Sequence, residues 1–357
     1  MIEHKWRRSE HIPTTPTAKW READLRGIVE STFRTIPPQG NGATLIDLKT
    51  GDVILHNEGT MRSLLCGFLL FAGVSVVLNS SAQAACSPVS GADALLWKRS
   101  VPVVWVGEMH GTAETPAAFG DLVCDALAHG KNVTVGLELA SQSQAALDAI
   151  LEAGDLEAAK RQLLAMPNWH MFFDGRSSQA MLALLVRMRG LKTEYPSLRV
   201  VAIENPWENT AGAKEAAVGK GVEAVVKHGP ADGLLVLTGN MHAMKHSPVA
   251  YPTAASLLPP ADVFSLLVTA RGGKSWQMTG IGCGAQPNGI QDKDITRTFG
   301  VYADAAYAKY GFDGVFALGK STTASPPADE AAAEMAECRK QFLAQPGASQ
   351  LTSAIPR

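Results

Sequence analysis

The feature that most constrains the fold is a regular alternation of short apolar runs with longer segments of helical spacing. Two runs rich in β-branched residues, at 101–106 and 133–139, enclose a helical segment at 115–130, and such a unit joins parallel strands. The sequence therefore predicts an α/β fold, with a mostly parallel central sheet and helices on both faces. Further strands are predicted at 199–203, 233–237, 262–269, 275–278 and 314–318. The run at 275–278 is antiparallel if it forms a hairpin with its predecessor across Gly272 and Gly273. Further helices are predicted at 141–153, 155–165, 174–190 and 211–227.

The N-terminal part of the chain differs from this domain. Residues 1–60 have mixed charge, several prolines and no sustained helical period, which predicts an extension outside the fold. A basic start at Met61, an apolar run and the small-residue site Ala-Gln-Ala then follow in the order of a secretory signal peptide. We expect residues 61–84 to be this signal, Met61 to be the true start and 85–357 to be a single mature domain. The alternative is a genuine cytoplasmic tail on a signal anchor, with membrane contact only through the uncleaved signal.

Cysteine usage agrees with export to the periplasm or the extracellular space. Four cysteines remain after the predicted cleavage, and an even number in an exported protein predicts disulfides. We favour a pair between Cys86 and Cys124, which would fix the N-terminus to the first helix. A second pair, Cys283 with Cys338, would hold the C-terminal segment.

Charge limits the class of partner. The net charge is -2 at pH 7, and the chain has no long run of Lys or Arg, which argues against nucleic acid as the main partner. A small molecule or a peptide is the expected substrate, and the oligomeric state stays open.

Ionisable side chains stand at the ends of several predicted strands. The stretch VVWVGEMHG places Glu108 and His110 two residues apart where a strand runs into a glycine, so both side chains share a face. Glu138 and Glu204 close the next two strands, and His242 follows a fourth. A parallel sheet gathers its carboxyl ends at one edge, where open α/β sheets bind ligands. We therefore predict a polar site at this edge, although a lone Glu such as Glu204 is more often a cap or an ion-pair partner.

Three motifs carry a resemblance to a known superfamily. GEMHG, GLE and TGNMH, in this order and at these strand ends, resemble the superfamily that joins erythromycin esterase-like proteins, Tiki/TraB-type proteases and ChaN-like haem-binding lipoproteins. The resemblance covers most of the mature chain. It implies a polar site made of Glu108, His110, Glu138 and His242, with Arg176 of DGRSS as a candidate anion binder.

Two kinds of chemistry follow from this set. In a hydrolase, Glu108, His110, Glu138 and His242 would either bind a divalent metal such as Mn, Co or Zn, whose bound water has a lowered pKa, or activate water directly. Arg176 would then hold an anionic group or the oxyanion. In a haem or iron carrier, His110 and His242 would ligate the iron and the glutamates would support them. The aromatic fraction of 6% gives little sign of a porphyrin slot and favours the hydrolase.

Simpler interpretations stand beside these. The whole protein would be a non-catalytic exported scaffold if the polar strand ends have lost their function. Arg176 would only pair with Asp174 at the start of the helix predicted there. The segment at 169–173 is either a lid over the crevice or an apolar plug between helices, and Met244 and His246 are expected to be solvent-facing loop residues.

Overall fold

The computed structural model divides the chain into two compact units, Met1–Asn79 and Ser80–Arg357. The described residues are 86–99, 101–166, 169, 174–205, 208, 210–228, 233–279 and 282–329, together with two short antiparallel strands, β1 (Leu45–Ile46) and β2 (Val53–Ile54). The predicted signal at 61–84 lies outside the described residues, as does most of the predicted extension.

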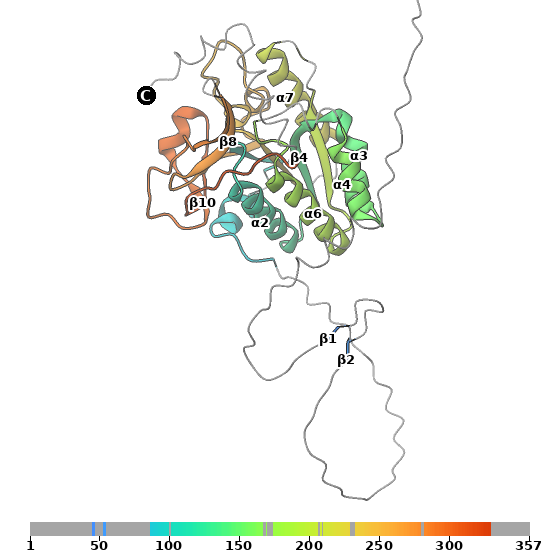
Figure 1. The fold of residues 1–357 in the computed structure, drawn as a ribbon. Coiled ribbons are helices and arrows are strands. Elements are labelled where there is room, and N and C mark those ends of the chain that lie inside the picture. Colours follow the sequence, from blue (N-terminus) through green and yellow to red (C-terminus); the bar gives the residue numbers. More distant parts are fainter. Residues whose placement is uncertain are drawn as a thin grey trace, which may run out of the picture. The chain divides into compact units, whose positions relative to one another are not determined.

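A seven-stranded sheet forms the centre of the second unit (Figure 1). Its order is β10-β11-β7-β3-β6-β4-β5, and every neighbouring pair is parallel except β10 with β11. The mostly parallel α/β sheet predicted from the alternation is therefore confirmed. Its strands are β3 (Val103–Glu108), β4 (Val133–Ala140), β5 (Arg199–Glu204), β6 (Gly233–Gly239), β7 (Val263–Thr269), β10 (Gly300–Ala303) and β11 (Gly314–Ala317).

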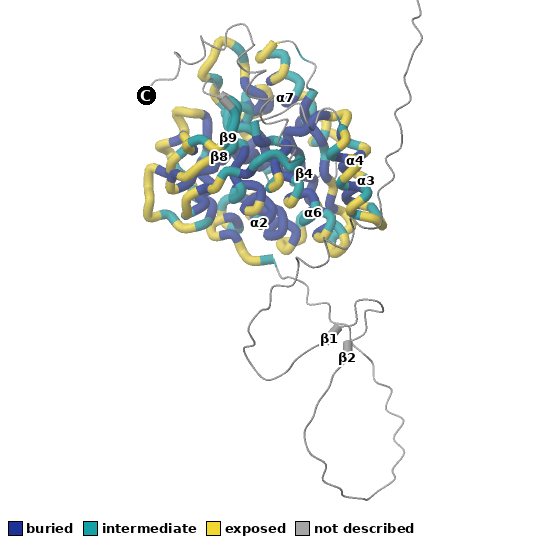
Figure 2. Tube along the Cα trace, viewed as in Figure 1, coloured by how far each residue is buried: buried dark blue, intermediate teal, exposed yellow. Residues whose placement is uncertain are grey.

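Helices cover both faces of the sheet because successive strand side chains point in opposite directions. In β3, Val104 and Val106 join the core under one set of helices, whereas Val103 and Trp105 join the core on the other face. Figure 2 shows the resulting buried centre. The first face carries α2 (Glu114–Ala128), α3 (Gln144–Glu152), α4 (Leu156–Leu164) and α6 (Gln179–Glu194), and the second carries α7 (Ala211–His228), the short α8 (Asn240–Ala243) and the 3-10 turn η4 (Ala305–Tyr310).

One predicted strand pairing is wrong. The segment β8 (Lys274–Thr279) does not form a hairpin with β7 but pairs antiparallel with β9 (Gly282–Pro287) in a separate two-stranded sheet. The cause lies at Gly272 and Gly273, whose φ angles of 84° and 106° turn the chain away from the sheet. Gly273 then bridges to Thr322 instead.

The helix predicted at 174–190 is displaced along the chain. It begins at Gln179, because the Ser178 hydroxyl accepts a hydrogen bond from the Met181 amide and caps the helix there. It continues past Gly190 to Glu194, so that glycine does not end it. The helix predicted from Ser141 likewise starts later, with a 3-10 turn over Ser141–Ser143 before α3.

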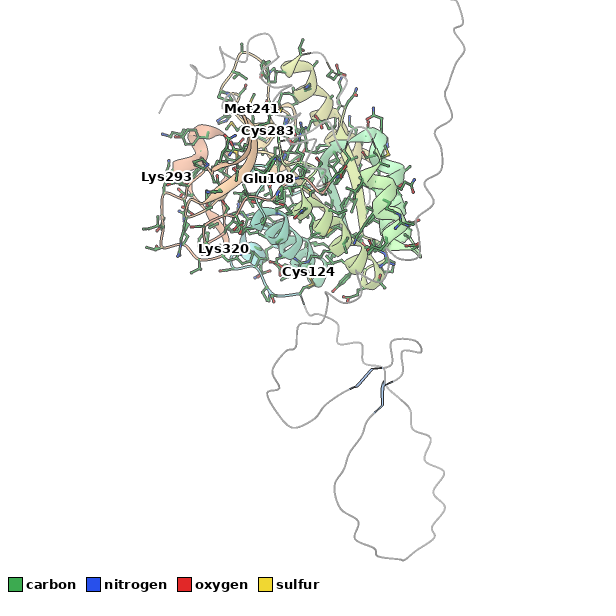
Figure 3. The ribbon with its side chains drawn as sticks, in the orientation of Figure 1. Glu108, Cys124, Met241, Cys283, Lys293 and Lys320 are labelled. Atoms are coloured by element: carbon green, nitrogen blue, oxygen red, sulfur yellow. A yellow bond between two sulfur atoms is a disulfide. The ribbon has the colours of Figure 1, made fainter. Side chains whose placement is uncertain are left out.

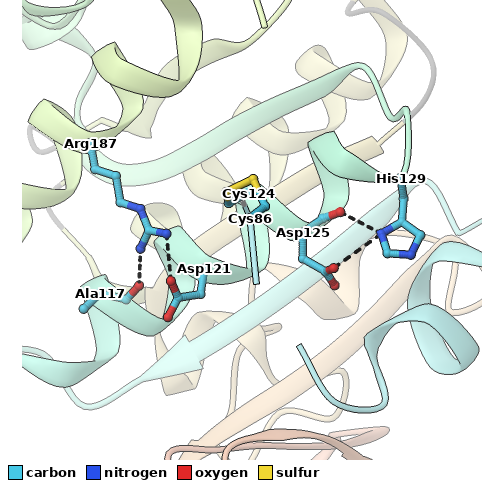
Figure 4. The surroundings of a disulfide bond; sticks show 7 residues. All are labelled: Cys86, Ala117, Asp121, Cys124, Asp125, His129 and Arg187. Atoms are coloured by element: carbon cyan, nitrogen blue, oxygen red, sulfur yellow. Dashed lines mark hydrogen bonds and ion pairs between the residues drawn. A yellow bond between two sulfur atoms is a disulfide. The ribbon is translucent and has the colours of Figure 1, made fainter. Parts of the chain in front are cut away.

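A disulfide joins Cys86 to Cys124 in α2, as predicted, with 5.3 Å between the Cα atoms (Figure 4). Cys283 is also disulfide-bonded, and Cys338, its predicted partner, lies outside the described residues. Within the described ranges, none of the helices combines the length and the apolar character needed to cross a bilayer.

Candidate active site

The carboxyl ends of four adjacent strands, β3, β6, β4 and β5, meet at one edge of the sheet. Glu108 is the last residue of β3, Glu204 is the last residue of β5, and Glu138 lies two residues before the end of β4. His242 lies in α8, which follows β6 directly. Figure 3 labels Glu108 near the middle of the domain. The predicted site residues thus come together at this edge.

Two histidines are each held by a buried carboxylate. The Nδ1 atom of His110 lies 3.0 Å from Oε1 of Glu108, and Nδ1 of His242 lies 2.9 Å from Oε2 of Glu215 in α7. The same Glu215 oxygen accepts a 2.7 Å hydrogen bond from the Ala254 amide, which fixes the carboxylate. Such a contact sets the tautomer and orientation of an imidazole, leaving Nε2 for chemistry.

Both Nε2 atoms face the same carboxylate. The distance is 3.4 Å from His110 to Oε2 of Glu138 and 3.3 Å from His242 to Oε1 of Glu138. The Gly239 amide donates a further 2.6 Å hydrogen bond to Oε2. Glu138 is therefore the centre of a chain of alternating carboxylates and imidazoles.

Glycine is needed at two positions around His110, because other groups pass too close to the backbone there for a side chain to fit. A Cβ atom at Gly239 would lie 2.9 Å from Nε2 of His110, so any larger residue would press on the ring. Gly111, with φ of 75°, would place a Cβ 2.0 Å from the carbonyl oxygen of Trp276 in β8. The strand β8 thus runs directly over the residue that follows His110.

Arg176 is committed to three carboxylates. Its Nε lies 2.9 Å from Oδ2 of Asp174, and its Nη1 lies 3.0 Å from Oε1 of Glu138 and 2.9 Å from Oε2 of Glu204. The guanidinium therefore offsets the negative charge of the edge. This arrangement favours the ion-pair interpretation of Arg176 and makes Glu204 part of the same network.

Neighbouring charges overcome burial at the centre of the site. Burial alone raises the pKa of Glu138, but His242, His110 and Arg176 together hold it well below its ordinary value. Burial alone lowers the pKa of His242, but Glu138 and Glu215 raise it to about 10. Glu138 and Glu108 likewise raise the pKa of His110 well above 6.5, against burial. These contacts therefore favour the charged form of the central carboxylate and of both rings.

The outer carboxylates behave differently. Burial raises the pKa of Glu108 and of Glu204 above the ordinary value, and their contacts with His110 and Arg176 only partly offset this. The side chains of His110 and His242 are 17% and 19% exposed, against 2% for Glu108. The two rings therefore form the accessible surface, and the carboxylates lie beneath them.

The predicted metal ligands lie beside a fixed positive charge, which disfavours a cation at this point. Across the described part of the chain, no three His, Cys, Asp or Glu side chains are grouped so that they could hold a metal ion. Arg176 bonds to Oε1 of Glu138, which places a fixed positive charge beside one of the predicted metal ligands.

One residue of this network, Glu215, was missed in the sequence. It lies on α7, away from any strand end, but Val218 and Val222 follow it at the spacing of a single helix face and both are buried. That spacing was the available signal. Of the other candidates, His246 is exposed as expected, whereas Met244 is partly buried and packs against the core on the second face of the sheet, contrary to expectation. Trp169 is buried, and 170–173 lie outside the described residues.

Comparison with known proteins gives no match to a family model or to a curated protein. Among solved structures, a mutant of the erythromycin esterase EreC in its open conformation is 12% identical over 66% of this chain and 93% of its own, with a TM-score of 0.49. A succinoglycan biosynthesis protein is 10% identical over 64% and 89%, with a TM-score of 0.47. A Bacillus cereus protein is 11% identical over 65% and 91%, with a TM-score of 0.43. An erythromycin esterase, one of the classes that the motifs resemble, is thus among the similar structures.

Proposed function

We propose that this chain is an exported hydrolase in which two histidines carry out both proton transfers of acyl-bond hydrolysis. The observation that carries the proposal is the meeting of the His110 and His242 Nε2 atoms at opposite oxygens of Glu138, at 3.4 and 3.3 Å. Hydrolysis needs one group that takes a proton from water and one that gives a proton to the leaving group. A pair of imidazoles on one carboxylate supplies both.

In one turnover, one proton is taken from water and one proton is given to the leaving group. The ring that has lost its Nε2 proton accepts one from water, and the water oxygen bonds to the carbonyl carbon of the substrate. The other ring, still an imidazolium, donates its Nε2 proton to the leaving group as the acyl bond breaks. After the reaction, each ring is in the protonation state in which the other ring began. Glu138 contacts both Nε2 atoms and offers the path by which a proton passes from one ring back to the other.

The remaining residues position the two rings. Glu108 accepts a hydrogen bond from Nδ1 of His110 at 3.0 Å, and Glu215 accepts one from Nδ1 of His242 at 2.9 Å. Each ring therefore presents its Nε2 atom to the substrate. Arg176 and the Gly239 amide hold Glu138 in place. The expected substrates are esters, lactones or peptides, and the mechanism needs no metal.

Export is supported by one further observation. The Cys86–Cys124 disulfide joins the start of the domain to α2, and disulfides persist in oxidising compartments such as the periplasm or the extracellular space. It agrees with the signal pattern in the sequence at 61–84. Fractionation of cells that express the full chain, with N-terminal sequencing of the product, tests this part of the proposal.

The experiment for the hydrolase is a panel of chromogenic esters, a lactone and a peptide, assayed with the full chain with and without chelator. We expect turnover that resists chelation and falls at least 100-fold in His110→Ala and in His242→Ala. His129→Ala is the matched control, because His129 also contacts a carboxylate, Asp125, at 3.4 Å but lies at the end of α2.

Each alternative gives a different result. Equal turnover in all three variants contradicts the paired-histidine mechanism. Stoichiometric bound metal that is lost in both active-site variants, with activity that chelation abolishes, assigns the site to a metallohydrolase. A haem absorption band that depends on the same two histidines, without turnover of the panel, assigns it to a carrier.

A further inference from the structure

A second candidate site lies at the opposite edge of the sheet. A pocket of about 390 Å³ is formed where β3 and β6 begin, next to the turn of η1 (Asp93–Trp97). Its apolar lining includes Leu96, Trp97 and Val104. Glu108 is at the other end of the six-residue strand β3, about 13 Å from Val104 at 3.3 Å per residue. The pocket is therefore separate from the candidate active site.

The ionisable side chains described in this pocket are all basic. Arg99, His129 and Lys131 line it, and no described Asp or Glu does. The guanidinium of Arg99 lies 5.5 Å from the ring centroid of Phe264, which orients the cation without neutralising it. Within the described ranges, neither Arg99 nor Lys131 takes part in an ion pair, in contrast to the neighbouring Lys98, which lies 2.6 Å from Asp93.

The helix that ends here explains part of this charge. The C-terminus of α2 carries a partial negative charge, and Lys131, which follows the last helical residue Ala128 by three positions, offsets it. His129 is also held from its Nδ1 side by the backbone carbonyl of Asp125 at 2.8 Å (Figure 4). Arg99 comes from a different segment, before β3, and the helix end gives no reason for its place beside Lys131. Two cations without an ion-pair partner among the described residues, around one partly apolar pocket, favour an anion as the missing partner.

We propose that this pocket binds a small organic anion, with its carboxylate or phosphate group at Arg99 and Lys131 and its ring or short acyl group against Leu96 and Trp97. The pocket volume of about 390 Å³ is in the range of small-molecule sites, which combine apolar walls with a few fixed polar groups. The same anionic chemistry occurs in lipid headgroups, but a hollow of this volume matches a whole small molecule, which favours a ligand free in solution. The site does not depend on the proposed hydrolysis.

The test is isothermal titration of the full chain with phenylphosphonate, an aromatic anion that has no ester bond to hydrolyse. The key variant is Arg99→Ala combined with Lys131→Ala. The matched control is Lys98→Ala combined with Lys227→Ala, which removes the same charge from two lysines that are in exposed ion pairs outside the pocket. We expect phenylphosphonate to bind the wild type, to bind the key variant at least tenfold more weakly and to bind the control within twofold of the wild type.

Four further measurements use the same proteins. Benzyl alcohol, which has the ring without the charge, and inorganic phosphate, which has the charge without the ring, should each bind at least tenfold more weakly than phenylphosphonate. Equal affinity of wild type and key variant overturns the proposal, and so does a lack of phenylphosphonate binding at millimolar concentration. Binding to phosphatidylglycerol vesicles without binding to phenylphosphonate overturns the assignment to a soluble ligand. Unchanged circular dichroism of the variants excludes unfolding as the cause.

Discussion

Replacing Glu138 by Gln tests the electrostatic centre of the candidate active site. Glutamine keeps the size of the side chain and one carbonyl oxygen but removes the charge. Arg176 retains Asp174 and Glu204 as partners, at 2.9 Å each, so the variant leaves no cation unpaired. The change therefore isolates what the Glu138 charge does to the two imidazoles that face it.

The expected magnitude follows from the contact with His242. Against burial, Glu138 is the foremost of the groups that raise the pKa of this ring to about 10. Unit charges about 4 Å apart interact by roughly 4 kcal/mol at an effective dielectric constant of about 20, which corresponds to about 3 on the pKa scale. Because 19% of the His242 side chain is open to solvent, screening reduces this value. We expect the pKa of His242 to fall by about 2 in Glu138→Gln.

The assay is a titration of the histidine ring protons by NMR, combined with urea unfolding at pH 6 and at pH 10.5. The pKa of His242 is higher in the folded protein than its ordinary value of 6.5. Its ionisation therefore stabilises the fold fully below pH 6.5, and this contribution is lost as the pH rises to about 10. If the pKa falls by about 2, the variant should lose roughly 3 kcal/mol less than the wild type between the two pH values.

Glu204→Gln is the matched control, because Glu204 is a buried carboxylate of the same edge that bonds to Arg176. It removes the same charge without touching either imidazole, and the pKa of His242 should move by less than about 0.5. A folded Glu138→Gln protein in which His242 still titrates near pH 10 would refute the reasoning. In that case Glu215 alone would account for the raised pKa, and the shared carboxylate would have no special role.

Three further predictions concern activity and stability. One imidazole must lose its proton before it can act as the base. The value of kcat/KM on the best substrate of the panel should therefore rise about tenfold per pH unit above pH 7 and level off by about pH 10. A flat profile between pH 6 and 8 would contradict the proton assignment. Gly239→Ala should lower kcat by about 100-fold at nearly unchanged Tm, since the new Cβ would lie 2.9 Å from the His110 ring while the backbone φ of -54° suits alanine. Gly136→Ala, whose Cβ would meet its neighbours at 3.4 Å, should leave kcat unchanged, and a similar loss in both variants would speak against the steric argument. Replacing Cys86 and Cys124 by serine should lower the free energy of unfolding by about 4 kcal/mol for a sequence separation of 38, and equal urea midpoints for both proteins would count against this.

The sequence predicts the central strands well because each is a short apolar run between turn signals. The antiparallel strands β9 and β10 were missed because they contain Gly282, Gly284 and Gly300, and glycine weakens the alternating pattern by which a strand is recognised. The pairing of β8 depended on two positive φ angles that the sequence alone does not specify. Strand existence follows from local pattern, whereas strand partners depend on turns and long-range contacts.

The same distinction applies to the candidate active site. Glu108, His110, Glu138 and His242 were predicted because parallel strands bring their carboxyl ends to one edge. Glu215 was not, because its helix brings it to His242 only through the packing of α7 on the second face of the sheet. Strand-end residues are thus predictable from topology, and the residues that support them from other elements require the packed structure.

The energetics of this edge argue that it is kept for a purpose other than stability. Buried ion pairs seldom stabilise a fold more than apolar side chains of the same volume would, yet this edge buries Glu108, Glu138, Glu204 and Glu215 together. The Oε2 atom of Glu108 is buried without a hydrogen-bond partner among the described residues, an arrangement that costs about 1 to 3 kcal/mol. A sheet edge under selection for stability alone would replace such a carboxylate with an apolar residue. Function accounts for this cost if Glu108 is needed to hold His110 with Nε2 directed at the reacting groups, because that role requires only Oε1.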